Sequence, residues 1–128
     1  MSQVQAIAKG VRMSPRKVGV VAGLVRGRSV ADALVILAHA PRRAAQPVAK
    51  VIASAKANAV NNHGLKEDTL KVEVLDVTSG PTMKRFRPVA RGSAHRIMKR
   101  SSHIRVIVTG EAKPARPAKA TATKETKE

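Results

Sequence analysis

The segment from Thr78 to Gly110 contains eight Lys and Arg residues and no Asp or Glu. Alternating apolar residues flank its most basic part, at Leu70, Val72 and Val74 and again at Ile104, Val106 and Val108. A period of two predicts two antiparallel strands. If Leu70 pairs near Val108, the turn lies near Val89, and each strand holds roughly twenty residues against the usual ~5–6. The sequence therefore predicts a hairpin too long to be covered by one small core.

The distal part of this hairpin is the most basic. From Lys84 to Arg100 the apolar alternation disappears, and both faces of the predicted ribbon carry cations. A two-stranded ribbon by itself is marginally stable in water. Since the segment has no acidic residue to pair with these cations, the countercharge must come from outside. We expect this arm, residues 78–103, to be enclosed by a polyanion such as the wall of a crevice in RNA.

The whole chain is also basic, with 25 Lys and Arg against 8 Asp and Glu in 128 residues and a net charge of +17. Such a charge attracts polyanions, of which nucleic acid is the leading candidate. Phe86 is the only aromatic residue, whereas the RRM and the OB fold stack bases on several rings. These modules are excluded, and recognition through phosphate, sugar and shape remains.

Other classes of function find no support in the sequence. No apolar run approaches the ~18 residues of a membrane-spanning helix, so no membrane partner is expected. Cysteine is absent and the four histidines lack the spacing of a zinc site, so we expect neither a metal nor a cofactor. Glu67 and Asp68 fall in a predicted turn, and Glu73 and Asp76 on a strand that also carries a lysine. These carboxylates are therefore not expected to form a pair suited to catalysis. The chain is not expected to be an enzyme.

Three helices are predicted before the hairpin. A weak strand at 3–11 precedes Ser14, which is followed by proline and marks the start of the first helix. Ser29 resembles the first residue of a capping box for a second helix, which Pro41 ends. The third helix follows, and Pro47 requires either a late start or a kink in its first turns.

These elements predict an α+β fold, with three helices packed on a short antiparallel sheet and a long extended β-hairpin. We expect residues 1–110 to form one RNA-binding domain, with a globular part of 1–77 and 104–110 and an arm of 78–103. Residues 111–128 are rich in Ala, Lys, Pro and Thr. Because they hold few large apolar side chains to offset the entropy of ordering, we expect a disordered basic tail of low complexity.

Candidate RNA contacts follow from where the cations fall. Arg12, Arg16 and Lys17 lie at a helix start, where cations oppose the helix dipole, so an external phosphate explains them best. The other candidates lie on the arm and at its base: Lys84, Arg85, Arg87, Arg91, Arg96, Lys99, Arg100 and His103. RNA contact and a solvated surface are equally supported for four more: Arg42, Arg43, Lys50 and Lys56.

A different polyanion is the basis of a second hypothesis, an architectural DNA-binding protein whose basic β-ribbon lies in a groove. Such a ribbon is expected to carry a wedge at its tip and to form a dimer. Pro88 offers a wedge. No exposed apolar face suggests dimerisation, so we expect no homo-oligomer and prefer RNA, with DNA as the alternative.

Four blocks of sequence, in order along the chain, resemble a known family: VRMSPRK at 11–17, ASAKANA at 53–59, GPTMKR at 80–85 and RIMKRSSHI at 96–104. The chain resembles the bacterial form of the large-subunit ribosomal protein twenty-two family, from about Gln3 to Thr109. The resemblance implies a structural constituent of the large ribosomal subunit in the cytoplasm. It implies binding to several domains of ribosomal RNA and support of subunit assembly.

The resemblance also implies a location within that subunit. The globular part is expected near the peptide exit, and the hairpin is expected to line the tunnel of the nascent peptide and to meet large-subunit protein four at a constriction. Carried over by position, the tunnel-lining tip comprises Met83, Lys84, Arg85, Arg87, Arg91, Gly92 and Ser93. Because the family's tip lies near the macrolide pocket, the block 83–85 is expected to influence drug accommodation.

Overall fold

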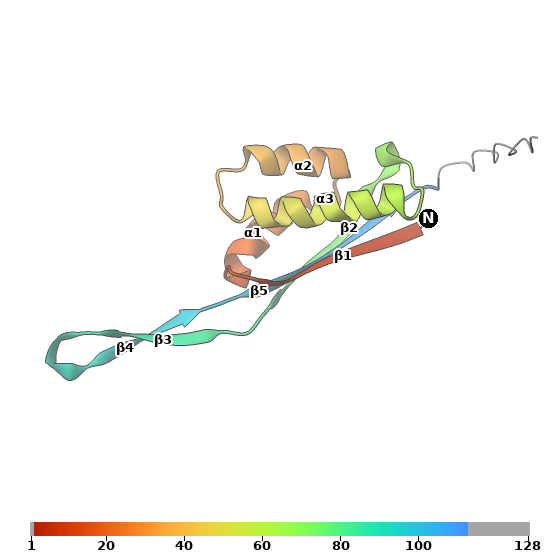
Figure 1. Cartoon of the computed structure of the whole chain (residues 1–128). Helices are drawn as coiled ribbons and strands as arrows, with labels where there is room; N and C mark the ends of the chain where they lie inside the picture. Colours follow the sequence, from red (N-terminus) through yellow and green to blue (C-terminus); the bar gives the residue numbers. More distant parts are fainter. Residues whose placement is uncertain (1, 113–128) are drawn as a thin grey trace, which may run out of the picture.

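The computed structural model describes residues 2–112, which form a three-layered globular part and a projecting arm (Figure 1). Its sheet has the order β1-β5-β2, with all neighbours antiparallel. The strands are β1 (Ser2–Val11), β2 (Lys71–Ser79) and β5 (Ser102–Gly110). The helices, all on one face of the sheet, are α1 (Pro15–Val25), α2 (Val30–His39) and α3 (Ala45–Asn61). The predicted α+β fold is confirmed.

Helix α1 begins where the sequence predicted. Ser14 has an extended backbone at the N-cap position, and Pro15 is the first helical residue, where its missing N–H costs no hydrogen bond. The buried side is Val18, Val21, Ala22 and Val25. This spacing of three and four residues is one face of a helix. Gly27 then adopts a φ of +72°, the left-handed conformation that favours glycine after a helix end.

The starts of α2 and α3 differ in their capping. Ser29 Oγ accepts a hydrogen bond of 3.1 Å from the backbone N–H of Asp32, so the predicted cap of α2 is present. Helix α3 begins at Ala45, which puts Pro47 in its first turn, where backbone N–H groups have no partner within the helix. Of the two possibilities left by Pro47, the late start is the one adopted.

The core lies between the sheet and the helices. Strand β5 is central and buries Ile104, Val106 and Val108 completely. Helix α3 packs over β1 and β5, and α1 packs over β2, while α2 lies on the outer side of α3 and α1. Ile52 of α3 is also fully buried. The sequence pattern thus places one apolar face of the sheet under the helices.

The hairpin is interrupted where it leaves the globular part. A separate two-stranded sheet, β3 (Met83–Pro88) and β4 (Ala94–Lys99), forms the outer arm. The break leaves three residues, 80–82, opposite two, 100–101, because Ser79 pairs with Ser102 and Met83 with Lys99. Pro81 has no N–H to continue the ladder. An extra residue on one of two paired strands bends the ribbon and changes its direction.

The predicted disorder of 111–128 falls almost wholly on residues outside those that the structure describes. Glu111 and Ala112 are described. The Glu111 carbonyl accepts a hydrogen bond of 2.9 Å from the N–H of Lys66, and its N–H donates one of 3.1 Å to Thr69 Oγ1. The chain therefore stays attached to the short 3-10 helix η1 (Glu67–Thr69) for at least these residues.

Candidate nucleic-acid interface

The arm exposes every residue of β3 and β4 to solvent. Four of its six cross-strand pairs join one cation to one apolar residue: Met83–Lys99, Lys84–Met98, Arg85–Ile97 and Phe86–Arg96. Opposed residues share a face, and successive pairs face opposite ways. Both faces therefore carry cations, as expected, with Arg85, Arg87 and Lys99 on one and Lys84 and Arg96 on the other.

This register keeps like charges from facing each other across the ribbon. A shift of one residue would place Lys84 opposite Lys99 and Arg87 opposite Arg96, and directly opposed like charges destabilise a strand pair. The turn fixes the register. Arg91 has a φ of +59° and Gly92 one of +69°, and the N–H of Val89 donates a hydrogen bond of 2.9 Å to the carbonyl of Ser93.

The predicted tunnel-lining residues fall into two groups, one at the turn and one at the other end of the ribbon. Arg91 and Gly92 belong to the short helix η2 (Ala90–Gly92) at the far end of the arm, and Ser93 follows them. Arg87 is one pair away from the turn-closing pair Pro88–Ala94. The block 83–85 lies at the opposite end, where Met83–Lys99 is the first pair after the break. The two groups are therefore separated by the length of the ribbon.

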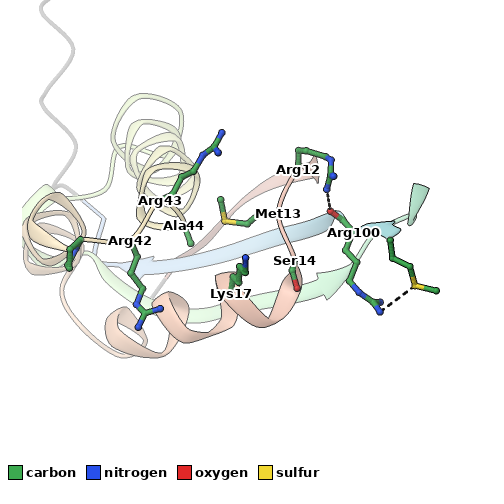
Figure 2. A pocket seen from close by; sticks show the side chains of 10 residues that line it. Arg12, Met13, Ser14, Lys17, Arg42, Arg43, Ala44 and Arg100 are labelled. Carbon is green, nitrogen blue, oxygen red and sulfur yellow. Dashed lines mark hydrogen bonds between the residues drawn. The ribbon is translucent and has the colours of Figure 1, made fainter. Parts of the chain in front are cut away.

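A basic cleft of about 870 Å³ lies where the arm joins the globular part. Five cations line it, from the β1–α1 connection, α1, the α2–α3 connection and the β4–β5 connection: Arg12, Lys17, Arg42, Arg43 and Arg100. Figure 2 shows these side chains around the cleft, with Ser14 at the start of α1. The residues that line it include no acidic one. We call this site the basic cleft.

Two helix N-termini meet at the basic cleft. Ser14, the N-cap of α1, makes no capping hydrogen bond, and the first turn of α1 holds no acidic residue. Ala44, the N-cap of α3, has no side chain that could cap, and that first turn also lacks an acidic residue. The positive end of the helix dipole favours an anion at both helix starts. The cleft thus has the chemistry of a phosphate site.

The basic cleft is joined to the arm by a hydrogen bond. The Arg12 guanidinium donates to the backbone carbonyl of Arg100 (Figure 2). Arg100 is the first residue after β4, so the loop before α1 is attached to the base of the arm. Arg12 and the base of the arm are therefore in direct contact beside the basic cleft.

The structure brings together some of the predicted cations and not others. Arg12 and Lys17 line the cleft with Arg100, whereas Arg16 is exposed on α1 outside it. Arg42 and Arg43, which the sequence left undecided, are in the cleft. Lys56 pairs with Glu67 at 2.5 Å. No local pattern singled out Arg42 and Arg43, because their place in the cleft depends on how the α2–α3 connection folds.

His103 lies at the base of the arm and is half-buried. Its Nδ1 accepts a hydrogen bond of 2.9 Å from the N–H of Gly10, so one ring nitrogen serves a contact within the protein. Arg105 pairs with Asp76 at 2.7 Å. In the described part of the chain this pair and Lys56–Glu67 are the two ion pairs. The cations from Lys84 to Arg100 have no carboxylate partner there.

Residues 2–112 show neither a cluster of metal ligands nor a membrane-spanning helix. They contain no group of three or more His, Asp or Glu side chains placed to hold a metal ion. Within the same residues, no helix combines the length and apolar character needed to cross a membrane.

Comparison with known proteins gives the family. The sequence profile of the family described as Ribosomal protein L22p/L17e matches residues 6–109. The chain belongs to this family. A curated relative, the large ribosomal subunit protein uL22 of Deinococcus radiodurans, is 56% identical over 103 residues, which cover 80% of this chain and 77% of the relative. The resemblance drawn from the four sequence blocks is confirmed.

Membership of the family determines the class of function. The chain is a ribosomal protein, a structural constituent of the large subunit of the cytoplasmic ribosome, and not an enzyme. RNA binding and a part in translation agree with this family. The sequence left RNA and DNA as possible partners of the basic ribbon. Membership of this family favours ribosomal RNA over DNA.

Proposed function

We propose that the protein binds ribosomal RNA of the large subunit through one continuous basic surface, formed by the basic cleft and the arm. The observation that carries the proposal is the cleft itself, where five cations and two uncapped helix starts meet without an acidic residue. Lys and Arg crowded in this way repel one another unless phosphate lies between them.

The two parts of the surface make different contacts. In the cleft, Arg12, Lys17, Arg42, Arg43 and Arg100 neutralise phosphates of an RNA strand that crosses the two helix starts. Along the arm, cations on both faces contact RNA segments on both sides: Lys84, Arg85, Arg87, Arg96 and Lys99. Arg16 contacts RNA beside the cleft. His103 orients the base of the arm through Nδ1 and offers Nε2 to RNA.

The arm lines the tunnel of the nascent peptide, and its turn forms the innermost part. Arg91, Gly92 and Ser93 face the tunnel with Arg87 beside them, and a loop of large-subunit protein four meets this turn at a constriction. Met83, Lys84 and Arg85 are at the other end of the ribbon, so they line the tunnel nearer the globular part, which sits by the peptide exit. An influence on macrolides then comes from the position of the whole arm.

The protein also supports assembly of the subunit. A ribbon with all its residues exposed gains stability when RNA surrounds it. The RNA segments that enclose the arm and cross the cleft are in turn held together by one chain. Binding and ordering of the arm are therefore coupled.

Sedimentation of a cell extract in rising salt tests the proposal. The protein should remain with the large subunit at salt concentrations that strip DNA-binding proteins, since many phosphate contacts act together. Recovery of the protein with the nucleoid would contradict ribosomal RNA binding and would favour the DNA hypothesis.

A further inference from the structure

Phe86 is the most exposed large apolar residue in the described part of the chain. Its exposed fraction is 70%, against 59% for Val35 and 47% for Met98. It is also the single aromatic residue of the sequence. No helix or core residue covers it, because β3 and β4 pair only with each other. The ring is therefore a flat apolar surface without a partner inside this chain.

Cations surround this ring. Arg96 lies directly opposite Phe86 in the register, so both side chains project from the same face of the arm. The next pair on that face, toward the globular part, is Lys84–Met98. Toward the turn, the pair is Pro88–Ala94, whose side chains are small. The face thus presents one ring with two cations close by, in a stretch that contains no acidic residue.

The chemistry of these neighbours selects the ligand. An apolar protein surface that covered the ring would have to remove water from Arg96 and Lys84 without offering them a countercharge, which is costly. A nucleotide satisfies both needs, since its base has a flat face that stacks on an aromatic ring and its phosphate pairs with the cations. Aromatic side chains with nearby Arg are the usual receptors for bases that have left a helix.

We propose that Phe86 and Arg96 form a platform on which one unpaired nucleobase of the large-subunit ribosomal RNA stacks. The inference rests on the proposed function and adds the kind of contact: a base, where the other contacts are with phosphate and sugar. A single ring receives a single base, so the platform differs from modules that align several rings along a strand.

A tryptophan in place of Phe86 reports on stacking directly. The chain contains no Trp or Tyr, so Phe86→Trp makes this side chain the main fluorophore of the full-length protein. Titration with deproteinised large-subunit ribosomal RNA should quench its emission roughly twofold or more through stacking on a base. The matched control is Ile97→Trp, on the opposite face of the adjacent pair. It should bind the RNA equally and be quenched much less.

Affinity gives a second readout. Phe86→Leu keeps an apolar side chain but removes the flat ring, and it should weaken binding to the same RNA by roughly tenfold, in the range known for loss of one stacked base. Ile97→Leu, on the opposite face, keeps the platform and should bind like the wild type. Both positions are exposed on the arm, so neither variant disturbs the core.

The outcomes separate this inference from the proposed function. If the wild type binds the RNA but Phe86→Leu binds as well as Ile97→Leu, the platform is wrong and RNA binding stands. Equal quenching of the tryptophans at 86 and 97 would likewise overturn the platform. If the wild type does not bind the RNA, the proposed function fails together with the inference.

Discussion

The backbone N–H of Gly10 donates a hydrogen bond of 2.9 Å to Nδ1 of His103. Gly10 has a φ of +69° and lies at the irregularity between Ala8 and Val11 in the pairing of β1 with β5, where two residues of β1 stand opposite His103 alone. His103 pairs with Thr78 on the other side. The imidazole thus links an edge strand to the root of the hairpin.

Replacing His103 should therefore affect stability as well as RNA contact. His103→Ala removes the acceptor for the N–H of Gly10, and we expect the free energy of unfolding to fall by about 1 kcal/mol. Urea unfolding, followed by circular dichroism, measures this. His63→Ala, a change at an exposed position after α3, is the control and should leave stability unchanged within about 0.5 kcal/mol. Equal midpoints for both variants would mean that the bond contributes nothing.

A second prediction concerns Gly80 at the break of the hairpin. A Cβ at this position would lie 2.7 Å from Ser101 Oγ and 3.2 Å from His103 Cε1. Ser101 Oγ donates a hydrogen bond of 2.6 Å to the Pro81 carbonyl, so it moves only by losing that bond. Gly80→Ala should reduce the free energy of unfolding by about 1–3 kcal/mol.

Gly23 supplies a control of opposite sign. It lies within α1, is exposed, and a Cβ there would meet nothing within 4 Å. Gly23→Ala should stabilise the protein by about 0.5–1 kcal/mol. If both glycine variants shifted the thermal midpoint in the same direction, the close packing at the root of the arm would be refuted.

Hydrogen exchange should distinguish the two sheets. Amides of β5 next to buried side chains, such as that of Val106, open only with global unfolding, whereas the β3–β4 ladder is exposed throughout. In the free protein the amides of 83–99 should exchange far faster than those of β5, and binding of large-subunit RNA should slow them. An arm already as protected as β5 without RNA would disprove its dependence on a partner.

Single cysteines test the place of the turn. The chain has no cysteine, so Ser93→Cys, beside the turn, and Ser54→Cys, exposed on α3, each provide one attachment point with little change in size. With a photoreactive maleimide attached, ribosomes stalled during translation should cross-link the nascent chain to position 93 and not to position 54. Cross-links to RNA alone from position 93 would place the turn outside the tunnel.

Local signals in the sequence predicted the elements well. Ser14 and Pro15 fix the start of α1, and Ser29 caps α2 through the N–H of Asp32, because capping depends on residues a few positions apart. The apolar alternation of Ile104, Val106 and Val108 likewise predicted the strand β5, because a period of two is also a local pattern. These patterns need no knowledge of the rest of the fold.

Features that depend on distant segments were harder to predict. Arg42 and Arg43 join Arg12 and Arg100 only because the α2–α3 connection folds back beside the root of the arm. The pairing of cations with apolar residues along β3 and β4 depends on a register that the turn at Arg91 and Gly92 sets. The pattern of charges along the chain could predict neither the position of Arg42 and Arg43 nor the register of β3 and β4. The first depends on tertiary contacts and the second on turn geometry.

The salt dependence of RNA binding tests the central claim most directly. Arg42→Gln combined with Arg43→Gln removes two charges from the basic cleft, while Lys66→Gln combined with Lys71→Gln removes two exposed charges outside it. In plots of log affinity for large-subunit ribosomal RNA against log salt, the cleft variant should lose roughly 1.5 from the slope and the control about 0. Equal slopes for the two variants would contradict phosphate binding in the cleft.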